Sequence, residues 1–118
     1  MSILTSILTG AKPGPRRMLV YGTAGIGKST FATCAPSPIV IQTEDGLGEI
    51  DCHKFPVAQT FTDVMNALAA LYQEDHRYRT VVIDSLDWLE RVIHAEVCRN
   101  RQVPTIEVIF PPKSGHPN

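Results

Sequence analysis

The chain has few cysteines, a net charge close to zero and no long apolar run, and each shortage excludes a class of protein. Its three cysteines form no C-x-x-C pair, which argues against a disulfide scaffold and favours reduced thiols in a cytoplasmic protein. Cys52-His53 has no second ligand pair at zinc spacing, so both are interpreted as loop residues. A formal net charge of −1 gives no general attraction to nucleic acid. No apolar stretch approaches the length of a membrane span, so no membrane association is expected.

With 118 residues and 43% hydrophobic composition, the chain has the size of one small globular domain. The breaker cluster Lys12-Pro13-Gly14-Pro15 separates an N-terminal arm, residues 1–15, from a core that spans residues 16–107. The Pro-rich residues 108–118 are predicted to be a disordered tail. Four apolar residues of the arm stand at helical spacing and predict either a short docked helix or a flexible arm: Ile3, Leu4, Ile7 and Leu8.

The strongest motif is the glycine-rich stretch Gly22-Thr23-Ala24-Gly25-Ile26-Gly27-Lys28-Ser29, which matches the phosphate-binding pattern G-x-x-x-x-G-K-[ST]. Phosphate oxygens need several donors converging on one point, and glycines permit the tight curl that aims backbone N–H groups there. Lys28 is predicted to place its ammonium on the β- and γ-phosphates, and the Ser29 hydroxyl to ligate Mg²⁺. Thr30 completes the predicted nucleotide-binding stretch, and a helix beginning near Lys28 points its positive end at the anion. An apolar run directly before the stretch disfavours the alternative, a glycine-rich turn that binds nothing.

Apolar runs that alternate with helical patterns predict an α/β fold, a P-loop type parallel sheet flanked by helices. Strands are expected at residues 16–21, 39–41 and 80–83, with a further extended piece near 55–57 and another at 105–110. In such sheets, ligands bind at the carboxyl ends of the strands.

Three helices are expected between and after these strands. A short one follows the glycine-rich stretch and ends at Ala35-Pro36-Ser37-Pro38. A longer one runs from a capping box formed by Thr60 and Asp63 to about Glu74. The last fades near residues 99–101 and has a buried stripe at helical spacing, made of Leu86, Leu89, Ile93 and Val97.

Two acidic residues follow predicted strands, at the edge that should also hold Gly22. Asp84 ends an apolar strand in the manner of a Walker B element, whose carboxylate holds Mg²⁺ through water; the alternative is a helix-capping role. Ser85 follows it, so the carboxylate that orients the attacking water is assigned to Glu44, at the end of the second strand. The alternative for Glu44 is an exposed loop acid beside Asp45.

These motifs together carry a resemblance to a known family. Residues 16–22 leading into 25–32 resemble the phage-type AAA-family ATP-binding proteins, RecA-like ATPases linked to phage single-strand annealing and recombination. Thr43-Glu44-Asp45-Gly46 is similar to the RecA-type segment that bears the catalytic glutamate. Val82-Ile83-Asp84-Ser85-Leu86 is similar to the RecA-type Walker B element, in which Ser also follows Asp.

The resemblance implies an ATPase with ATP and Mg²⁺ as cofactors, in the cytoplasm of a bacterial host. It also implies homo-oligomers and a single-stranded DNA or recombination partner for the full-length family. Two alternatives stay open. A nucleotide kinase would want an arginine-rich lid, for which Arg99 and Arg101 are the candidates. A non-catalytic remnant would bind nucleotide weakly or fold poorly. A GTPase is disfavoured because the sequence has no N/T-K-x-D motif.

The family-like pattern breaks near Glu107, so the chain is expected to be a truncated or frameshifted copy of a longer ATPase, incomplete at its C-terminal side. RecA-like sheets have a later strand between the P-loop strand and the Walker B strand. Here those two strands must pair directly or leave a gap. The predicted result is nucleotide binding with little or no hydrolysis. Reading the coding DNA in the other two frames beyond codon 107 tests the origin. If those frames encode no strand-and-helix pattern and the purified chain turns over ATP robustly, the truncation hypothesis is contradicted.

Overall fold

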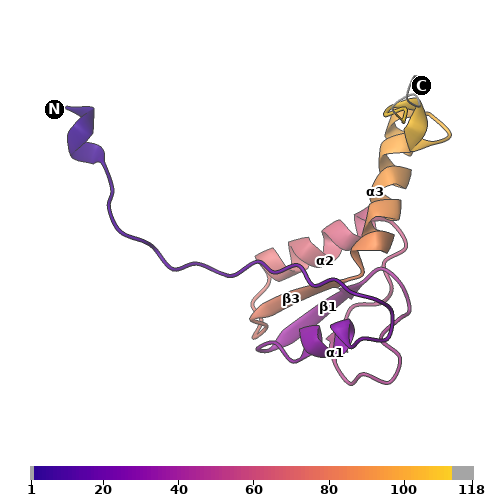
Figure 1. Cartoon of the computed structure of the whole chain (residues 1–118), viewed down its shortest axis with the longest axis horizontal. Coiled ribbons are helices and arrows are strands. Elements are labelled where there is room, and N and C mark those ends of the chain that lie inside the picture. The colour runs from indigo at the N-terminus through magenta and orange to yellow at the C-terminus, as the bar shows by residue number, and fades with distance from the viewer. Residues whose placement is uncertain (1, 113–118) are drawn as a thin grey trace, which may run out of the picture.

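The computed structural model describes residues 2–112, whose body is a three-stranded parallel sheet flanked by helices (Figure 1). The strand order is β2 (His53–Lys54), β1 (Pro38–Gln42), β3 (Thr80–Asp84), with β1 in the centre. This architecture confirms the predicted α/β class. The predicted extended piece at 55–57 follows β2 directly, and His53 belongs to that strand, so its interpretation as a loop residue was wrong.

The central strand β1 carries the core because it has a partner on each side. It pairs with β3 over its whole length, from Pro38 opposite Thr80 to Gln42 opposite Asp84. Val40 and Ile41 are 0% and 1% exposed, as a parallel strand covered on both faces requires. Gln42 is also buried, and its side-chain amide donates to the Phe55 carbonyl at 2.7 Å, so this buried polar group is satisfied.

Helix α2 (Phe61–Gln73) connects β2 to β3 and covers the sheet on the side opposite α1 (Lys28–Thr33) (Figure 1). Its start confirms the predicted capping box, since the Thr60 hydroxyl accepts from the Asp63 amide while the Asp63 carboxylate accepts from the Thr60 amide. Val64 and Ala67 of α2 pack with Ile41 in the core cluster.

Helix α3 (Leu86–Arg101) has the predicted extent but not the predicted burial. Leu89 packs against the core, yet no residue of α3 is buried, and Leu86 and Ile93 are 46% and 37% exposed. Figure 1 shows why: α3 begins at the body, where it contacts α2, and then runs away from the sheet, so most of its apolar stripe stays partly exposed. Periodicity predicts which face of a helix is apolar but not whether another element covers it.

The predicted strand at residues 16–21 is absent from the sheet, which corrects the sequence-based expectation. The segment lies in no helix, strand or turn, and Met18, Leu19 and Tyr21 are 73%, 67% and 87% exposed. A strand needs a neighbour to complete its hydrogen-bond ladder. β1 already has two neighbours, and residues 16–21 do not pair with the free side of β3. The apolar run is therefore left without a strand partner.

The two ends of the described chain differ from expectation in a similar way. A short 3₁₀ helix, η1 (Ile3–Ser6), forms at the tip of the arm but is exposed, so the docked-helix alternative is wrong. The arm stretches far from the body (Figure 1) and raises the radius of gyration to 19.5 Å, against about 13 Å for a compact chain of 100 residues. Residues 105–110 form the 3₁₀ helix η2 (Ile106–Val108) instead of a strand. The predicted tail lies partly outside the described residues, from 113 onward.

No helix within residues 2–112 is both long and apolar enough to cross a membrane.

Replacing Ile41 by alanine tests whether β1 carries the core. Ile41 is 1% exposed, so Ile41→Ala should lower the free energy of unfolding by about 2–5 kcal/mol through lost burial and a residual cavity. Ile7→Ala removes the same atoms from a side chain that is 63% exposed. It should change the free energy of unfolding by less than about 0.5 kcal/mol. Urea titration of both variants measures the difference, and equal effects would show that the body is not built on β1.

Candidate functional site

The candidate site lies at the carboxyl ends of β1 and β3. Gln42 and Asp84 stand opposite each other in the last register pair, so both strands end at the same level. Glu44 lies two residues beyond β1 and is half-buried, while Asp84 is itself the last residue of β3. The structure therefore brings both predicted acidic residues to the predicted edge of the sheet, although the strand expected to lead into Gly22 is absent.

The glycine-rich stretch is a tight loop whose shape depends on its glycines. Gly25 and Gly27 have φ angles of 78° and 102°, in the left-handed region that other residues rarely adopt, and Gly27 is the N-cap of α1. A Cβ on Gly22 would lie 3.2 Å from Cγ2 of Ile26, a tight contact. These positions leave the backbone room to approach a phosphate closely, as the motif predicts.

Lys28 curls back over this loop. Its ammonium donates to the carbonyl oxygens of Gly22 at 2.7 Å and Thr23 at 2.8 Å. The positive charge is thus held at the mouth of the loop, beside the first turn of α1. Phosphate oxygens are stronger acceptors than these carbonyls because they carry negative charge.

Ser29 and Asp84 meet although 55 residues separate them in the sequence. The Ser29 hydroxyl donates to Oδ2 of Asp84 at 2.5 Å, and the pair is partly buried. A hydroxyl and a carboxylate are the hard oxygen ligands that Mg²⁺ prefers. The two residues predicted as metal ligands therefore share one place, and their chemistry fits that ion.

A third contact at this edge was missed by the sequence reasoning. Thr43 is 5% exposed, and its hydroxyl accepts from the Ser85 amide at 2.9 Å and donates to the Ser85 carbonyl at 2.7 Å. Its own amide donates to the Asp84 carbonyl at 2.9 Å. Thr43 thereby ties the end of β1 to the residue after Asp84 and fixes the backbone just before Glu44. A buried threonine at a strand end hints at such a bond, but the sequence cannot name the partner.

Glu44 lies beside the site without bonding to it. No hydrogen bond among residues 2–112 joins its side chain to Lys28, Ser29 or Asp84. Its carboxylate lies over Gly46, where an added Cβ would be 3.3 Å from Oε1. The side chain is therefore near the right strand end, but its predicted catalytic role remains a prediction.

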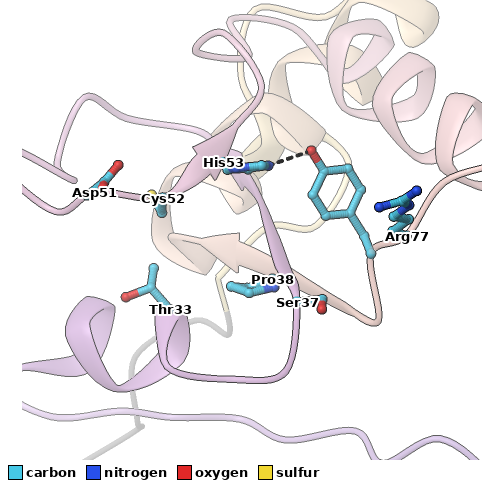
Figure 2. Close-up of a pocket in the computed structure, with 8 residues that line it drawn as sticks. Thr33, Ser37, Pro38, Asp51, Cys52, His53 and Arg77 are labelled. Carbon is cyan, nitrogen blue, oxygen red and sulfur yellow. Dashed lines mark hydrogen bonds between the residues drawn. The ribbon is translucent and has the colours of Figure 1, made fainter.

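A separate pocket of about 420 Å³ lies at the opposite, amino-terminal edge of the sheet (Figure 2). Nδ1 of His53 and the Tyr78 hydroxyl close one side of it with a hydrogen bond of 2.8 Å. Within the described range, no group of three or more His, Cys, Asp and Glu residues is arranged to hold a metal. The pocket is lined by Thr33, Ser37, Pro38, Asp51, Cys52, His53, Arg77 and Tyr78. Because the strands begin here, this pocket is distinct from the site at Ser29 and Asp84.

Comparison with protein families gives one finding that bears on the site. A family model described as an AAA domain matches residues 14–108, a range that includes the glycine-rich loop, Glu44 and Asp84. Comparisons with curated proteins and with solved structures give no match.

Asp84→Asn separates a metal-holding role from a structural one. Asparagine keeps an oxygen that can accept from Ser29 but removes the charge, so affinity for Mg²⁺-nucleotide should fall about 10- to 100-fold. Affinity for nucleotide in EDTA should change little. Asp87→Asn is the matched control, because Asp87 is an exposed carboxylate in the first turn of α3. Isothermal titration of the wild type and both variants, with and without Mg²⁺, measures the affinities. Equal loss in both conditions would assign Asp84 a structural capping role instead.

Proposed function

Because the chain belongs to the AAA domain family, we propose that it binds ATP with Mg²⁺ where its glycine-rich loop meets the ends of β1 and β3. Family membership makes it a P-loop nucleotide-binding domain of the ATPase type. The observation that carries the finer proposal is the 2.5 Å contact between Ser29 and Asp84. It joins the last residue of the loop motif to the last residue of β3, at the edge where ligands of parallel sheets bind.

Each residue of the site has a role that follows from its chemistry. The loop amides surround the phosphates, and the left-handed angles of Gly25 and Gly27 support this cradle. Lys28 exchanges its two carbonyl acceptors for oxygens of the β- and γ-phosphates. Ser29 and Asp84 hold the metal ion, one directly and one through water. The ion, when bound, neutralises charge on the phosphates.

Glu44 is proposed as the residue that orients the attacking water. Support comes from its position two residues beyond β1 and from its partial burial, whereas its neighbour Asp45 is exposed. Thr43 adds support because its bonds to Ser85 hold the preceding backbone in place. Ser85 cannot take this role, since its hydroxyl is not a base at neutral pH.

We further propose that the domain acts in phage DNA recombination or replication, in the cytoplasm of a bacterial host. The support is the likeness of residues 16–32, Thr43-Glu44-Asp45-Gly46 and residues 82–86 to the phage-type ATPases. The match of residues 14–108 to the AAA domain spans all three segments. Single-stranded DNA and further copies of the chain are the partners that this role would involve.

Lys28→Ala tests the proposed ATP site. The phosphates lose their main cation while the loop amides remain, so ATP affinity should fall at least about tenfold, because a charge-assisted contact contributes about 1.5–3 kcal/mol. The wild type should prefer ATP to GTP. Lys12→Ala removes the same side chain from the exposed arm and should bind as the wild type does. Isothermal titration of the three proteins measures the affinities.

Equal ATP affinity for Lys28→Ala and the wild type would show that the loop does not bind the phosphates. Phosphoryl transfer to a nucleoside monophosphate, measured on the same protein, would favour the kinase alternative. Binding without turnover would favour the non-catalytic one.

A further inference from the structure

Within residues 2–112, the outer edge of β3, like that of β2, has no strand partner, and neither does one apolar segment that is tethered to β3. The edge is the side of β3 that faces away from β1. The segment is residues 18–21, directly before the glycine-rich loop. No other part of residues 2–112 pairs with either of them.

The free edge of β3 has the properties of an interior strand. Its sequence, Thr80-Val81-Val82-Ile83-Asp84, is continuously apolar between its ends, as strands with neighbours on both sides are. Yet Val81 is 45% exposed, and none of the β3 residues is buried. An edge of this kind presents a row of unpaired backbone groups that favours the addition of another strand.

The segment has the matching properties. Met18, Leu19, Val20 and Tyr21 are all apolar or aromatic, they lie in no helix, strand or turn, and their exposures run from 40% to 87%. Valine and tyrosine favour strands. No backbone hydrogen bond joins the segment to another described residue, so pairing would break no existing ladder.

The loop contacts bring the two features to the same end of the sheet. Ser29 is bonded to Asp84, the last residue of β3, and Lys28 is bonded to the carbonyl of Gly22, the residue after Tyr21. The segment and β3 therefore both end at this edge, and a segment that docks would run parallel to β3. A short tether of this kind gives an effective concentration in the millimolar range, far above that of a second copy in dilute solution.

We propose that the outer edge of β3 is a docking surface for residues 18–21 of the same chain, which join the sheet as a fourth parallel strand when Mg²⁺-nucleotide binds. This inference rests on the proposed function. Two contacts couple the events. Phosphates draw Lys28 away from the carbonyls of Gly22 and Thr23, which frees the exit of the segment. Metal held between Ser29 and Asp84 fixes the loop to the end of β3, so less entropy is lost on docking.

Hydrogen exchange read by mass spectrometry tests this on the full chain. With Mg²⁺ and a non-hydrolysable ATP analogue, the amides of residues 18–21 should exchange at least about tenfold more slowly than without them. Amides of β3 should gain protection in the same experiment. Titration calorimetry under the same conditions establishes whether the analogue is bound.

Proline variants make the test specific to pairing. Neighbouring amides in a strand point to opposite edges, so Leu19→Pro or Val20→Pro must remove a donor that faces β3. At least one of the two should lose the nucleotide-induced protection. Ala11→Pro is the matched control, since Ala11 lies in the exposed arm outside the segment, and it should keep the protection. Protection that survives both Leu19→Pro and Val20→Pro would overturn the proposal.

The remaining outcomes separate the two proposals. Bound analogue without added protection would overturn strand docking and leave the ATP site standing. Absence of binding would overturn the ATP site and strand docking with it. Protection that grows with protein concentration would mean pairing between copies, which would overturn the segment of the same chain as occupant.

Discussion

The contact between the Ser29 hydroxyl and the Asp84 carboxylate is the one on which the site depends. It joins a loop that no strand anchors to the end of β3, across 55 residues of sequence. Without this contact, the glycine-rich loop would be held only by its chain connections, to the exposed segment on one side and the six-residue helix α1 on the other. The same pair supplies the oxygen ligands of the proposed metal, so one interaction both positions the site and gives it its chemistry.

The sheet contributes a second constraint, the level at which its strands end. Gln42 opposite Asp84 and the bonds from Thr43 to Ser85 hold the two strand ends together. A shift of β1 by one residue against β3 would move Glu44 away from Asp84, and it would turn the side chains of β1 to the other face of the sheet. Register thus links the buried core of β1 to the acidic residues at the site.

Features that local chemistry determines could be predicted from the sequence, and features that need a distant partner could not. The capping box of α2 and the span of β3 follow from residues a few positions apart. The pairing of residues 16–21, the cover of the α3 stripe and the bonds of Thr43 depend on what lies beside them in space. For the candidate site, the glycine-rich loop and the strand that ends at Asp84 could be located from their patterns, because each motif has particular residue types at fixed spacing. Their roles in phosphate and magnesium binding remain predictions. The bonds of Thr43 could not be located in this way, because the sequence does not name the partner of a buried hydroxyl.

The small interior of the body has a consequence for how the protein persists in a cell. Among residues 2–112, the buried apolar residues are few and mostly modest in size: Ile39, Val40, Ile41, Leu47, Ala58, Val64 and Ala67. A core this limited leaves a narrow margin between the folded and unfolded states. A ligand that binds only the folded state, present at about 100 times its dissociation constant, adds about 2.7 kcal/mol. If the proposed ATP site is occupied, the fraction of this chain that escapes proteolysis would follow the ATP concentration around it, which would link the protein's abundance to cellular energy status.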